Sequence, residues 1–340
     1  MSGTVPMFRE MFPTPLSLGL FVLYISLFVN QGWLVTASQD ANNGYHYSTA
    51  IAVLLAELIK LLASIAIYAF NYPLWGLFGE LKKNGKVFAL YLIPASLYCL
   101  YNNLSFINLS TFDPTTYFMV LQLRVVVTGV VFQILFKKQL SRNQWLSLFL
   151  LTFGCMLKQV SFGESSNSAS GSSKELSLSL SFNSLLLFAQ VMCSCFAGVY
   201  NEYLLKTQGE VNVFVQNIFH NINSMICIGL VFSYQRGVDG IRWTTLEPFL
   251  EPKVFLVVCN NAAVGIVTSF FLKYLNSIVK NFASALELVI TAILSYFLFS
   301  IPIYLNTVLS ILLISIATWT YSRNPIANVN TKKLLLPSHK

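Results

Sequence analysis

The chain has 340 residues, of which 55% are hydrophobic and only 10% carry a charged side chain. About a quarter of the residues of a soluble globular chain are charged, because its surface must face water. This composition therefore excludes a soluble domain and predicts an outer surface that faces lipid. The formal net charge is +8, but the basic residues form short clusters between apolar runs, which is typical of topology signals and not of nucleic-acid binding.

Ten apolar runs that are long enough to cross a bilayer follow one another along the chain. A transmembrane helix needs about 20 predominantly apolar residues, with a range of about 17–25. The sequence therefore predicts an all-α polytopic membrane protein with ten transmembrane helices. The predicted spans are residues 16–36, 47–70, 87–107, 113–136, 143–160, 182–205, 211–233, 254–275, 281–300 and 304–321.

The connecting segments support an even number of spans. If both termini are cytosolic, fourteen of the 21 Lys and Arg residues fall in cytosolic segments, five fall on the lumenal side and two lie inside spans. The positive-inside rule predicts a bias of this kind, and removing one span would invert every later segment. We therefore expect residues 1–15 and the polar tail 322–340 to be cytosolic.

A Ser-rich stretch divides the chain near its middle. Residues 161–181 are weakly charged and rich in Ser, which is typical of a flexible linker, here on the lumenal side. The linker separates residues 16–160 from residues 182–321, so each part holds five predicted spans. An odd-numbered unit repeated in tandem reverses its orientation in the membrane. We therefore expect two inverted five-helix halves, although their similarity residue by residue is weak.

Polar side chains in the third and fourth predicted spans are candidates for a binding site. Tyr98 and Asn102 share one helix face, and Tyr117 and Arg124 share another. Asn103 follows Asn102 and adds a second amide. An Arg in mid-membrane costs about 3 kcal/mol or more unless it faces a polar cavity.

Two interpretations of Arg124 stay open. It could form a structural ion pair with a carboxylate in another span, such as Glu57 or Glu287. Alternatively, its guanidinium binds an anionic ligand, because the planar fork of donors matches phosphate oxygens.

The seventh predicted span carries a stripe of polar side chains. Asn217, Asn221 and Ser224 fall at positions i, i+4 and i+7, so they share one helix face. Amides exposed to lipid would be costly, so this face is expected to meet protein or water. Amides suit the edges of a base or the hydroxyls of a sugar. His220 lies one position off this face and is interpreted as a packing residue.

Two lysines flank the short connection between the eighth and ninth predicted spans. For Lys280, a ligand-binding cation and ordinary cytosolic charge are equally good interpretations. Lys273 lies just inside its span and can extend toward a cavity or toward the surface. Together, Arg124 and Lys273 would supply two cations for a diphosphate.

Signatures of catalysis and of metal binding are missing from the sequence. There is no Ser-His-Asp arrangement, no HExxH, no GxxxxGK[ST] and no acidic metal pair, and the six cysteines follow no disulfide or metal-site spacing. We therefore assign no catalytic residue, metal or cofactor. The chain is expected to hold a polar ligand in the membrane and not to be an enzyme.

The run YNNLSFINLSTFDPTTYFMVLQLRVVVTGVVF resembles nucleotide-sugar transporters of the CMP-sialate/UDP-galactose type. The similarity continues at SRNQWLSLFLLTFG, FAGVYNEYLLK and LKYLNSIVKNFASALE. The resemblance implies a drug/metabolite-transporter fold and a multi-pass Golgi membrane antiporter. Its substrates would be a cytosolic nucleotide sugar, first of all UDP-galactose, and a lumenal nucleoside monophosphate such as UMP.

The family's binding residues can be placed on this sequence. They fall on Tyr98, Asn102, Tyr117, Arg124, Asn217 and Lys273, to which the polar pattern adds Asn103 and Asn221. The sequence departs from the family where Arg124 replaces a Lys, Leu121 a Tyr, Phe219 a Gln and Asn221 a Tyr. Because these changes touch base and sugar contacts, UDP-GlcNAc and CMP-sialate remain alternative substrates. A non-transporting Golgi scaffold with the same fold is the alternative outside transport, and homodimer formation is left open.

Overall fold

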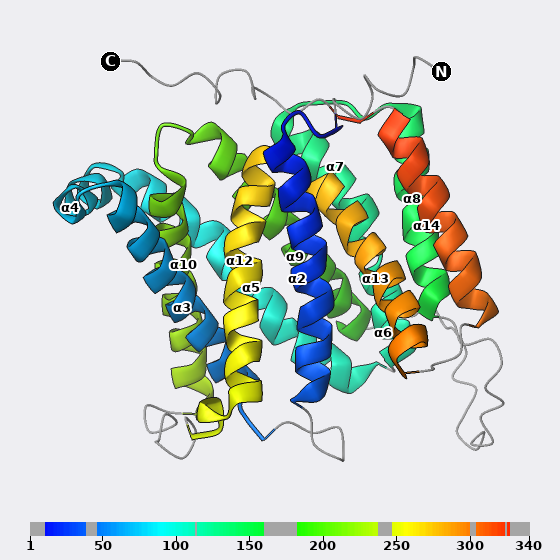
Figure 1. Ribbon diagram of the computed structural model, residues 1–340, viewed down its shortest axis with the longest axis horizontal. Coiled ribbons are helices and arrows are strands. Elements are labelled where there is room, and N and C mark those ends of the chain that lie inside the picture. Colours follow the sequence, from blue (N-terminus) through cyan, green and yellow to red (C-terminus); the bar gives the residue numbers. More distant parts are fainter. Residues whose placement is uncertain are drawn as a thin grey trace.

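The computed structural model describes residues 11–38, 46–112, 114–159, 182–236, 247–299, 304–323 and 325–326. Within these ranges the chain forms helices and no strand, which confirms the predicted all-α class. The long helices run side by side in one bundle (Figure 1). They are α2 (Pro15–Ala37), α3 (Thr49–Asn71), α5 (Gly85–Thr111), α7 (Arg124–Phe136), α8 (Arg142–Gln159), α9 (Phe182–Thr207), α10 (Val213–Arg236), α12 (Pro252–Tyr274), α13 (Ser277–Phe299) and α14 (Leu305–Arg323). Between them lie the shorter elements α4 (Leu74–Lys83), α6 (Pro114–Leu121) and the 3₁₀ helix η2 (Glu247–Leu250).

Polar caps and prolines determine where some of the spans begin. At the start of α2, the Thr14 side chain accepts a hydrogen bond from the Ser17 amide at 3.2 Å, and Pro15 takes the first helical position. At the start of α13, the Asn276 side-chain oxygen accepts a hydrogen bond from the Val279 amide at 2.8 Å. The first amides of a helix have no partner within the helix. These caps therefore satisfy donors that would be costly to bury unpaired.

Nine stretches of the described chain are long and apolar enough to cross a membrane. They match nine of the ten predicted spans, and α6 and α7 together form one of them, Thr115–Phe136. The remaining prediction, residues 143–160, corresponds to α8, which runs beside α14 (Figure 1). Polar residues at both of its ends, including Arg142 and Lys158, lower its mean hydropathy. The multi-pass helical class is therefore confirmed, while the count of ten is not.

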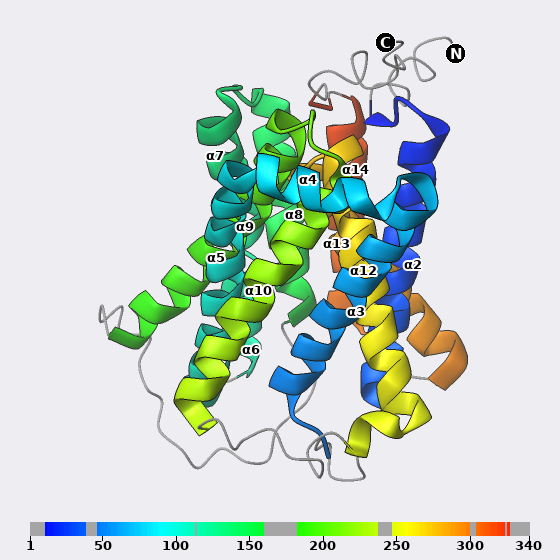
Figure 2. The ribbon, with the colours of Figure 1, turned by 90° about the vertical axis from the view of Figure 1, so that its left-hand side faces the viewer.

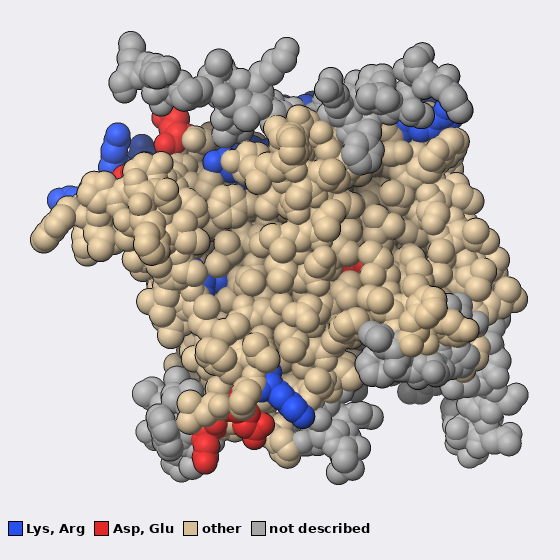
Figure 3. Space-filling view, in the orientation of Figure 1, with Lys and Arg blue, Asp and Glu red and all other residues tan. Residues whose placement is uncertain are grey.

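One face of the bundle has an uncharged belt of the kind that a bilayer requires (Figure 3). On the face shown in Figure 3, the charged side chains gather near the upper and lower edges, and the region between them is almost free of charge. The helix α2 begins, and α14 ends, at the same upper edge in Figure 1. The hydrocarbon core excludes unpaired charge from such a belt, so the bundle is built to span a membrane.

The helix α4 lies where the sequence analysis places only a connection between the second and third spans. Figure 2 shows it lying across the ends of the spans and not along them. Its ten residues are too few to cross a bilayer. The side chains of Trp75 and Phe78 are 91% and 74% exposed, and Lys82 and Lys83 end the helix. Exposed aromatic and basic residues on one short helix are typical of a helix that lies in the membrane interface.

Helices of the first predicted half pack mainly on helices of the second. The helix α2 packs on α12 and α13, α3 packs on α10 and α12, and α5 packs on α9 and α10. Likewise α7 packs on α9, and α8 packs on α14. The spans can be numbered 1 to 10 in chain order, with α6 and α7 together as the fourth and α8 as the fifth. If each span of the first half is exchanged with the span of the same rank in the second half, every contact in this set becomes either itself or another contact of the set. Two inverted halves related by a two-fold axis would pack in this way.

The span over residues 115–136 is not one regular helix. It is interrupted between α6 and α7, and Arg124 is the first residue of α7. At the interruption, the amides of Gln122 and Leu123 donate to the carbonyls three residues earlier, at 3.1 and 3.0 Å. A short 3₁₀ stretch inside a helix often marks a functional hinge. Arg124 therefore directly follows a tightened turn.

Candidate substrate-binding site

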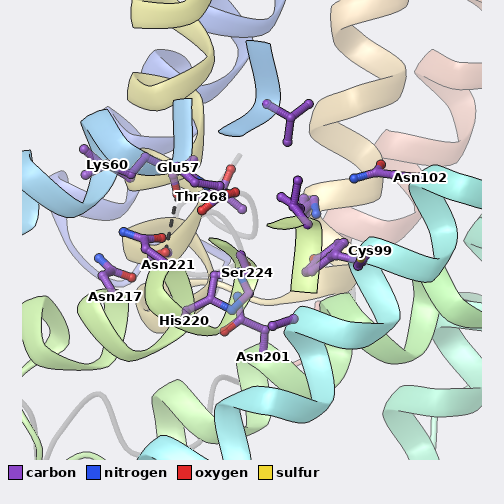
Figure 4. A pocket seen from close by; sticks show the side chains of 18 residues that line it. Glu57, Lys60, Cys99, Asn102, Asn201, Asn217, His220, Asn221, Ser224 and Thr268 are labelled. Carbon is purple, nitrogen blue, oxygen red and sulfur yellow. Dashed lines mark hydrogen bonds and ion pairs between the residues drawn. The ribbon is translucent and has the colours of Figure 1, made fainter. Parts of the chain in front are cut away.

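A cavity of about 250 Å³ lies inside the bundle between α3, α5, α9, α10, α12 and α13. We call it the central cavity, and Figure 4 shows its wall from close by. Polar groups inside a membrane bundle generally mark a substrate pathway, because they would be costly against lipid. The polar and charged side chains on its wall are Glu57, Lys60, Tyr98, Asn102, Asn201, Asn217, His220, Asn221, Ser224, Thr268, Ser269 and Lys280.

The polar stripe of α10 faces the central cavity. Asn217, Asn221 and Ser224 all line it, and none is more than 5% exposed. The side-chain nitrogen of Asn217 is buried without a hydrogen-bond partner among the described residues. By contrast, the Asn223 side chain donates to the Phe88 and Phe219 carbonyls at 3.0 and 2.9 Å. One helix therefore carries an amide that holds the fold together and an amide that is left for a ligand.

His220 is a cavity residue that the sequence analysis assigned to packing. Its ring centre lies 6.0 Å from those of both Tyr91 and Tyr98, in edge-to-face geometry. Its Nδ1 atom is buried and has no hydrogen-bond partner among the described residues. The imidazole thus packs against aromatic rings and also forms part of the cavity wall. In the sequence, His220 lies one position off the face of Asn217, Asn221 and Ser224, so the helical spacing did not predict that it lines the cavity.

A buried ion pair forms one side of the central cavity. The Lys60 ammonium donates to a Glu57 carboxylate oxygen at 2.5 Å. The other Glu57 oxygen is buried without a partner among the described residues. Gly265 leaves room for the lysine, because a Cβ atom added there would lie 2.5 Å from the Lys60 Cδ atom. Glu57 therefore pairs with Lys60, and the hypothesis that it pairs with Arg124 is wrong.

A smaller cavity of about 140 Å³ adjoins the central one. The two share Val53, Cys99, Asn102 and Ile228 as lining residues. Asn103 lines only the smaller cavity, and its side-chain nitrogen donates to the Cys99 carbonyl at 2.8 Å. The two neighbouring amides therefore lie on connected cavities.

A third cavity, of about 310 Å³, lies between α2, α7, α9 and α13. We call it the Arg124 cavity, since Arg124 lines it together with Asn281 and Glu287. The Arg124 guanidinium forms no ion pair or hydrogen bond with any residue that the structure describes, although Glu287 lines the same cavity. This guanidinium is therefore available to an anionic ligand.

Lys280 joins the central cavity to the Arg124 cavity, because its side chain lines both. Tyr98 on the central cavity also approaches Gly198 on the Arg124 cavity. A Cβ atom added at Gly198 would lie 3.7 Å from the Tyr98 hydroxyl. The two cavities thus meet at these residues, with Arg124 and Lys280 as the cations beside the junction. The position of Lys280 in the sequence does not distinguish a lysine that lines both cavities from one that only adds cytosolic charge.

Two of the predicted binding residues lie away from these three cavities. Tyr117 is only 4% exposed, and its hydroxyl accepts a hydrogen bond from the Gln190 side chain at 2.8 Å. The Lys273 ammonium lies over the ring of Tyr274, 5.9 Å from its centre. The structure therefore brings Tyr98, Asn102, Asn217 and Asn221 together on one cavity, while Lys280 takes the place expected for Lys273.

The buried carboxylate of Glu202 fixes the start of the helix that carries Lys280. One oxygen accepts hydrogen bonds from the Ser277 amide and hydroxyl, at 2.7 and 2.5 Å. The other accepts from the Lys206 ammonium at 2.6 Å, and Lys206 also donates to the Leu275 carbonyl. This cluster ties α9 to the turn between α12 and α13. Buried charge is tolerated here because each group is paired and hydrogen-bonded.

Comparison with known proteins agrees with this arrangement. The family model described as nucleotide-sugar transporter matches residues 16–322. The UDP-galactose transporter senju of Drosophila melanogaster is 48% identical, over 94% of this chain and 90% of its own. CMP-sialic acid transporter 1 of Oryza sativa subsp. japonica is 29% identical, over 86% of this chain and 89% of its own. The UDP-N-acetylglucosamine/UDP-N-acetylgalactosamine transporter nstp-4 of Caenorhabditis elegans is 28% identical, over 84% and 86%.

A multi-pass helical bundle with cationic and polar cavities inside it defines a membrane carrier of polar, anionic solutes. The chain belongs to the nucleotide-sugar transporter family. It is accordingly an integral membrane transporter of nucleotide sugars and not an enzyme.

Proposed function

We propose that this protein exchanges cytosolic UDP-galactose for lumenal UMP across the Golgi membrane. The observation that carries the proposal is the pair of cations, Arg124 and Lys280, beside the junction of two cavities inside the bundle. Charge-assisted hydrogen bonds from such groups bind phosphate strongly. The choice of sugar and base is supported by the 48% identity to a transporter named for UDP-galactose, and the Golgi membrane by the family.

The substrate would occupy both cavities. The base and ribose would lie in the central cavity, against Tyr98 and the amides of Asn102, Asn217 and Asn221. The phosphates would bind Arg124 and Lys280 beside the junction, and the hexosyl group would enter the Arg124 cavity. Ligand pockets of this kind commonly measure about 300–1,000 Å³. The central cavity, at about 250 Å³, is below that range, and the Arg124 cavity, at about 310 Å³, is at its lower end, so the two together would hold the substrate.

The two five-helix halves, residues 16–160 and 182–321, would rock against each other to open this site alternately to each side. The symmetric packing of α3 on α10 and of α8 on α14 supports this arrangement. The linker 161–181, predicted to be lumenal, and most of the segments 1–15 and 322–340, predicted to be cytosolic, lie outside the described residues. Cytosolic termini, like homodimer formation, stay predictions.

Exchange follows from the same charges. Closing the bundle around an empty site would enclose the unpaired Arg124 guanidinium, and an uncompensated buried charge is strongly unfavourable. Either UDP-galactose or UMP would supply the compensating phosphate. The empty carrier should therefore reorient slowly, which couples inward transport of one substrate to outward transport of the other.

The test is uptake by purified protein in liposomes. Labelled UDP-galactose, UDP-GlcNAc and CMP-sialate would be offered separately to vesicles with and without internal UMP. We expect UDP-galactose to enter fastest, and only with UMP inside. Equal uptake without internal UMP would contradict exchange, and preferred uptake of another sugar nucleotide would contradict the substrate. Absence of any uptake by folded, inserted protein would favour a scaffold.

A further inference from the structure

Glu287 is a carboxylate halfway along a membrane helix that the binding of base and phosphates leaves without a role. It is half-buried on α13, lines the Arg124 cavity, and accepts a hydrogen bond from the Thr291 hydroxyl at 3.2 Å. It forms no ion pair with any Lys or Arg that the structure describes. A carboxylate at this depth is costly unless it faces a polar space or a ligand.

The geometry of α13 gives the Arg124 cavity two chemically different ends. Lys280, Ser284 and Glu287 fall at positions i, i+4 and i+7, and all three line the cavity. Glu287 lies seven positions after Lys280, which is about 10 Å along the helix axis at the α-helical rise of 1.5 Å per residue. Between them, the Ser284 hydroxyl lies 3.4 Å from the hydroxyl of Tyr24. The cavity thus runs along α13 from an ammonium, past hydroxyls, to a carboxylate.

The separation of positive and negative ends determines which sugar can follow phosphates that bind Lys280 and Arg124. Its hexosyl group would extend along α13 toward Glu287. Sugar hydroxyls donate hydrogen bonds, and those accepted by a carboxylate are stronger than neutral ones. A sugar with its own carboxylate would instead bring two negative charges together in a poorly solvated site, while both cations of the cavity already bind phosphate.

We propose that Glu287 makes the carrier selective for neutral hexosyl groups and excludes nucleotide sugars whose sugar carries a carboxylate. The inference rests on the proposed transport function and adds a determinant of its selectivity. The competing interpretation is that Glu287 only balances the charge of Arg124. In that case, its removal would affect every phosphate-bearing ligand to the same degree.

A matched pair of ligands separates these interpretations. UDP-galactose and UDP-galacturonate differ only at C6, which is a hydroxymethyl group in one and a carboxylate in the other. Each would compete, unlabelled, against the exchange of labelled UMP for internal UMP in liposomes. The UMP exchange involves no sugar and therefore reports nucleotide transport by itself. The variants at the proposed site are Glu287→Gln and Glu287→Asp. The control is Glu57→Gln, which removes a carboxylate from the central cavity instead.

We expect the wild-type protein to be inhibited by UDP-galactose at a concentration about tenfold or more below that for UDP-galacturonate, since like charges in an interface disfavour the wrong ligand strongly. Glu287→Gln should lower this ratio about tenfold, because a change in phosphate binding would act on both inhibition constants and cancel in their ratio. Glu287→Asp should keep the ratio. Glu57→Gln should change both inhibition constants together, because it acts on the nucleotide portion.

Three results would overturn the inference. They are equal inhibition of the wild-type protein by both ligands, an unchanged ratio in Glu287→Gln, and a proportional loss of UMP exchange and of both inhibitions in that variant. If Glu287→Gln fails to insert, Ser284→Asp is the second test. It adds a carboxylate one turn nearer Lys280 and should raise the ratio, and an unchanged ratio would count equally against the inference. Wild-type protein without any UMP exchange would instead refute the proposed function itself.

Discussion

Two regions of the bundle use polar residues in opposite ways. Where α8 packs on α14, the Ser310 hydroxyl donates to the Gly154 carbonyl at 2.7 Å, and the Lys158 ammonium donates to the Thr307 hydroxyl at 3.0 Å. In the central and Arg124 cavities, the Asn217 nitrogen, a Glu57 oxygen and the Arg124 guanidinium have no such partner among the described residues. The first region joins helices, and the second is kept ready for a ligand.

The difference shows how to interpret a polar residue in a membrane helix. An unpaired polar group costs several kcal/mol in an apolar environment, so unpaired groups that gather on one cavity would gain most from a bound ligand. Polar residues paired across a helix interface contribute to folding, while clustered unpaired ones indicate binding. Stability and transport should therefore respond separately to substitutions in the two regions.

The largest effect is expected from Arg124→Ala. Each charge-assisted hydrogen bond contributes about 1.5–3 kcal/mol, and about 1.4 kcal/mol corresponds to a factor of ten. Losing the fork of donors should lower exchange of UDP-galactose for UMP about 100-fold or more, with Arg124→Lys in between. The control is Lys273→Ala, which should stay within about twofold because Lys273 lies off the three cavities. Normal uptake by Arg124→Ala would disprove the assigned phosphate contact.

The next effect concerns the α8–α14 interface. A Cβ atom at Gly154 would lie 3.1 Å from the Leu313 Cβ and 3.2 Å from the Ile314 Cγ1. Gly154→Val should therefore overpack the interface and lower the free energy of unfolding by about 1–3 kcal/mol, measured as a lower melting temperature in detergent. Transport per folded molecule should stay near normal. Gly229→Ala is the control, because its added Cβ would meet no atom within 4 Å; equal melting of both variants would contradict the prediction.

The two asparagines of α10 allow the same comparison within one helix. Asn217→Leu should lower uptake about tenfold, the effect of one lost hydrogen bond of about 1.4 kcal/mol, and leave melting nearly unchanged. Asn223→Leu should do the reverse, since it removes hydrogen bonds to the Phe88 and Phe219 carbonyls, each contributing about 0.6 kcal/mol in membrane bundles. Melting temperature and initial uptake rate, measured on the same preparations, distinguish the two. Equivalent behaviour of both variants would mean that the unpaired amide has no special role.

The smallest effect is expected from Gly265→Ala. The added methyl group would displace the Lys60 side chain, whose Cδ atom would be only 2.5 Å away, but a lysine can shift at modest cost. We expect about a threefold rise in KM for UDP-galactose, of the order of 0.6 kcal/mol, with little change in the maximal rate. A change in maximal rate alone would indicate that Lys60 influences reorientation and not binding.

Several of these features were predictable because they are periodic in the chain. The apolar runs gave nine spans that the structure supports, and the spacing of Asn217, Asn221 and Ser224 gave their common face. Tyr98, Asn102 and Arg124 were likewise identified as residues too polar for lipid. By contrast, α4 was missed, because a ten-residue helix leaves no span-length signal.

The composition and periodicity of the sequence determined that this chain crosses a membrane as helices and that polar groups lie inside it. Only the tertiary structure decided which of those groups meet. Tyr117 pairs with Gln190, Glu57 pairs with Lys60, and Lys280 reaches both cavities where Lys273 had been expected. The reason is that a helix has a fixed set of faces, but the neighbour that covers each face is set by contacts between segments distant along the chain, such as α3 with α10 and α2 with α12.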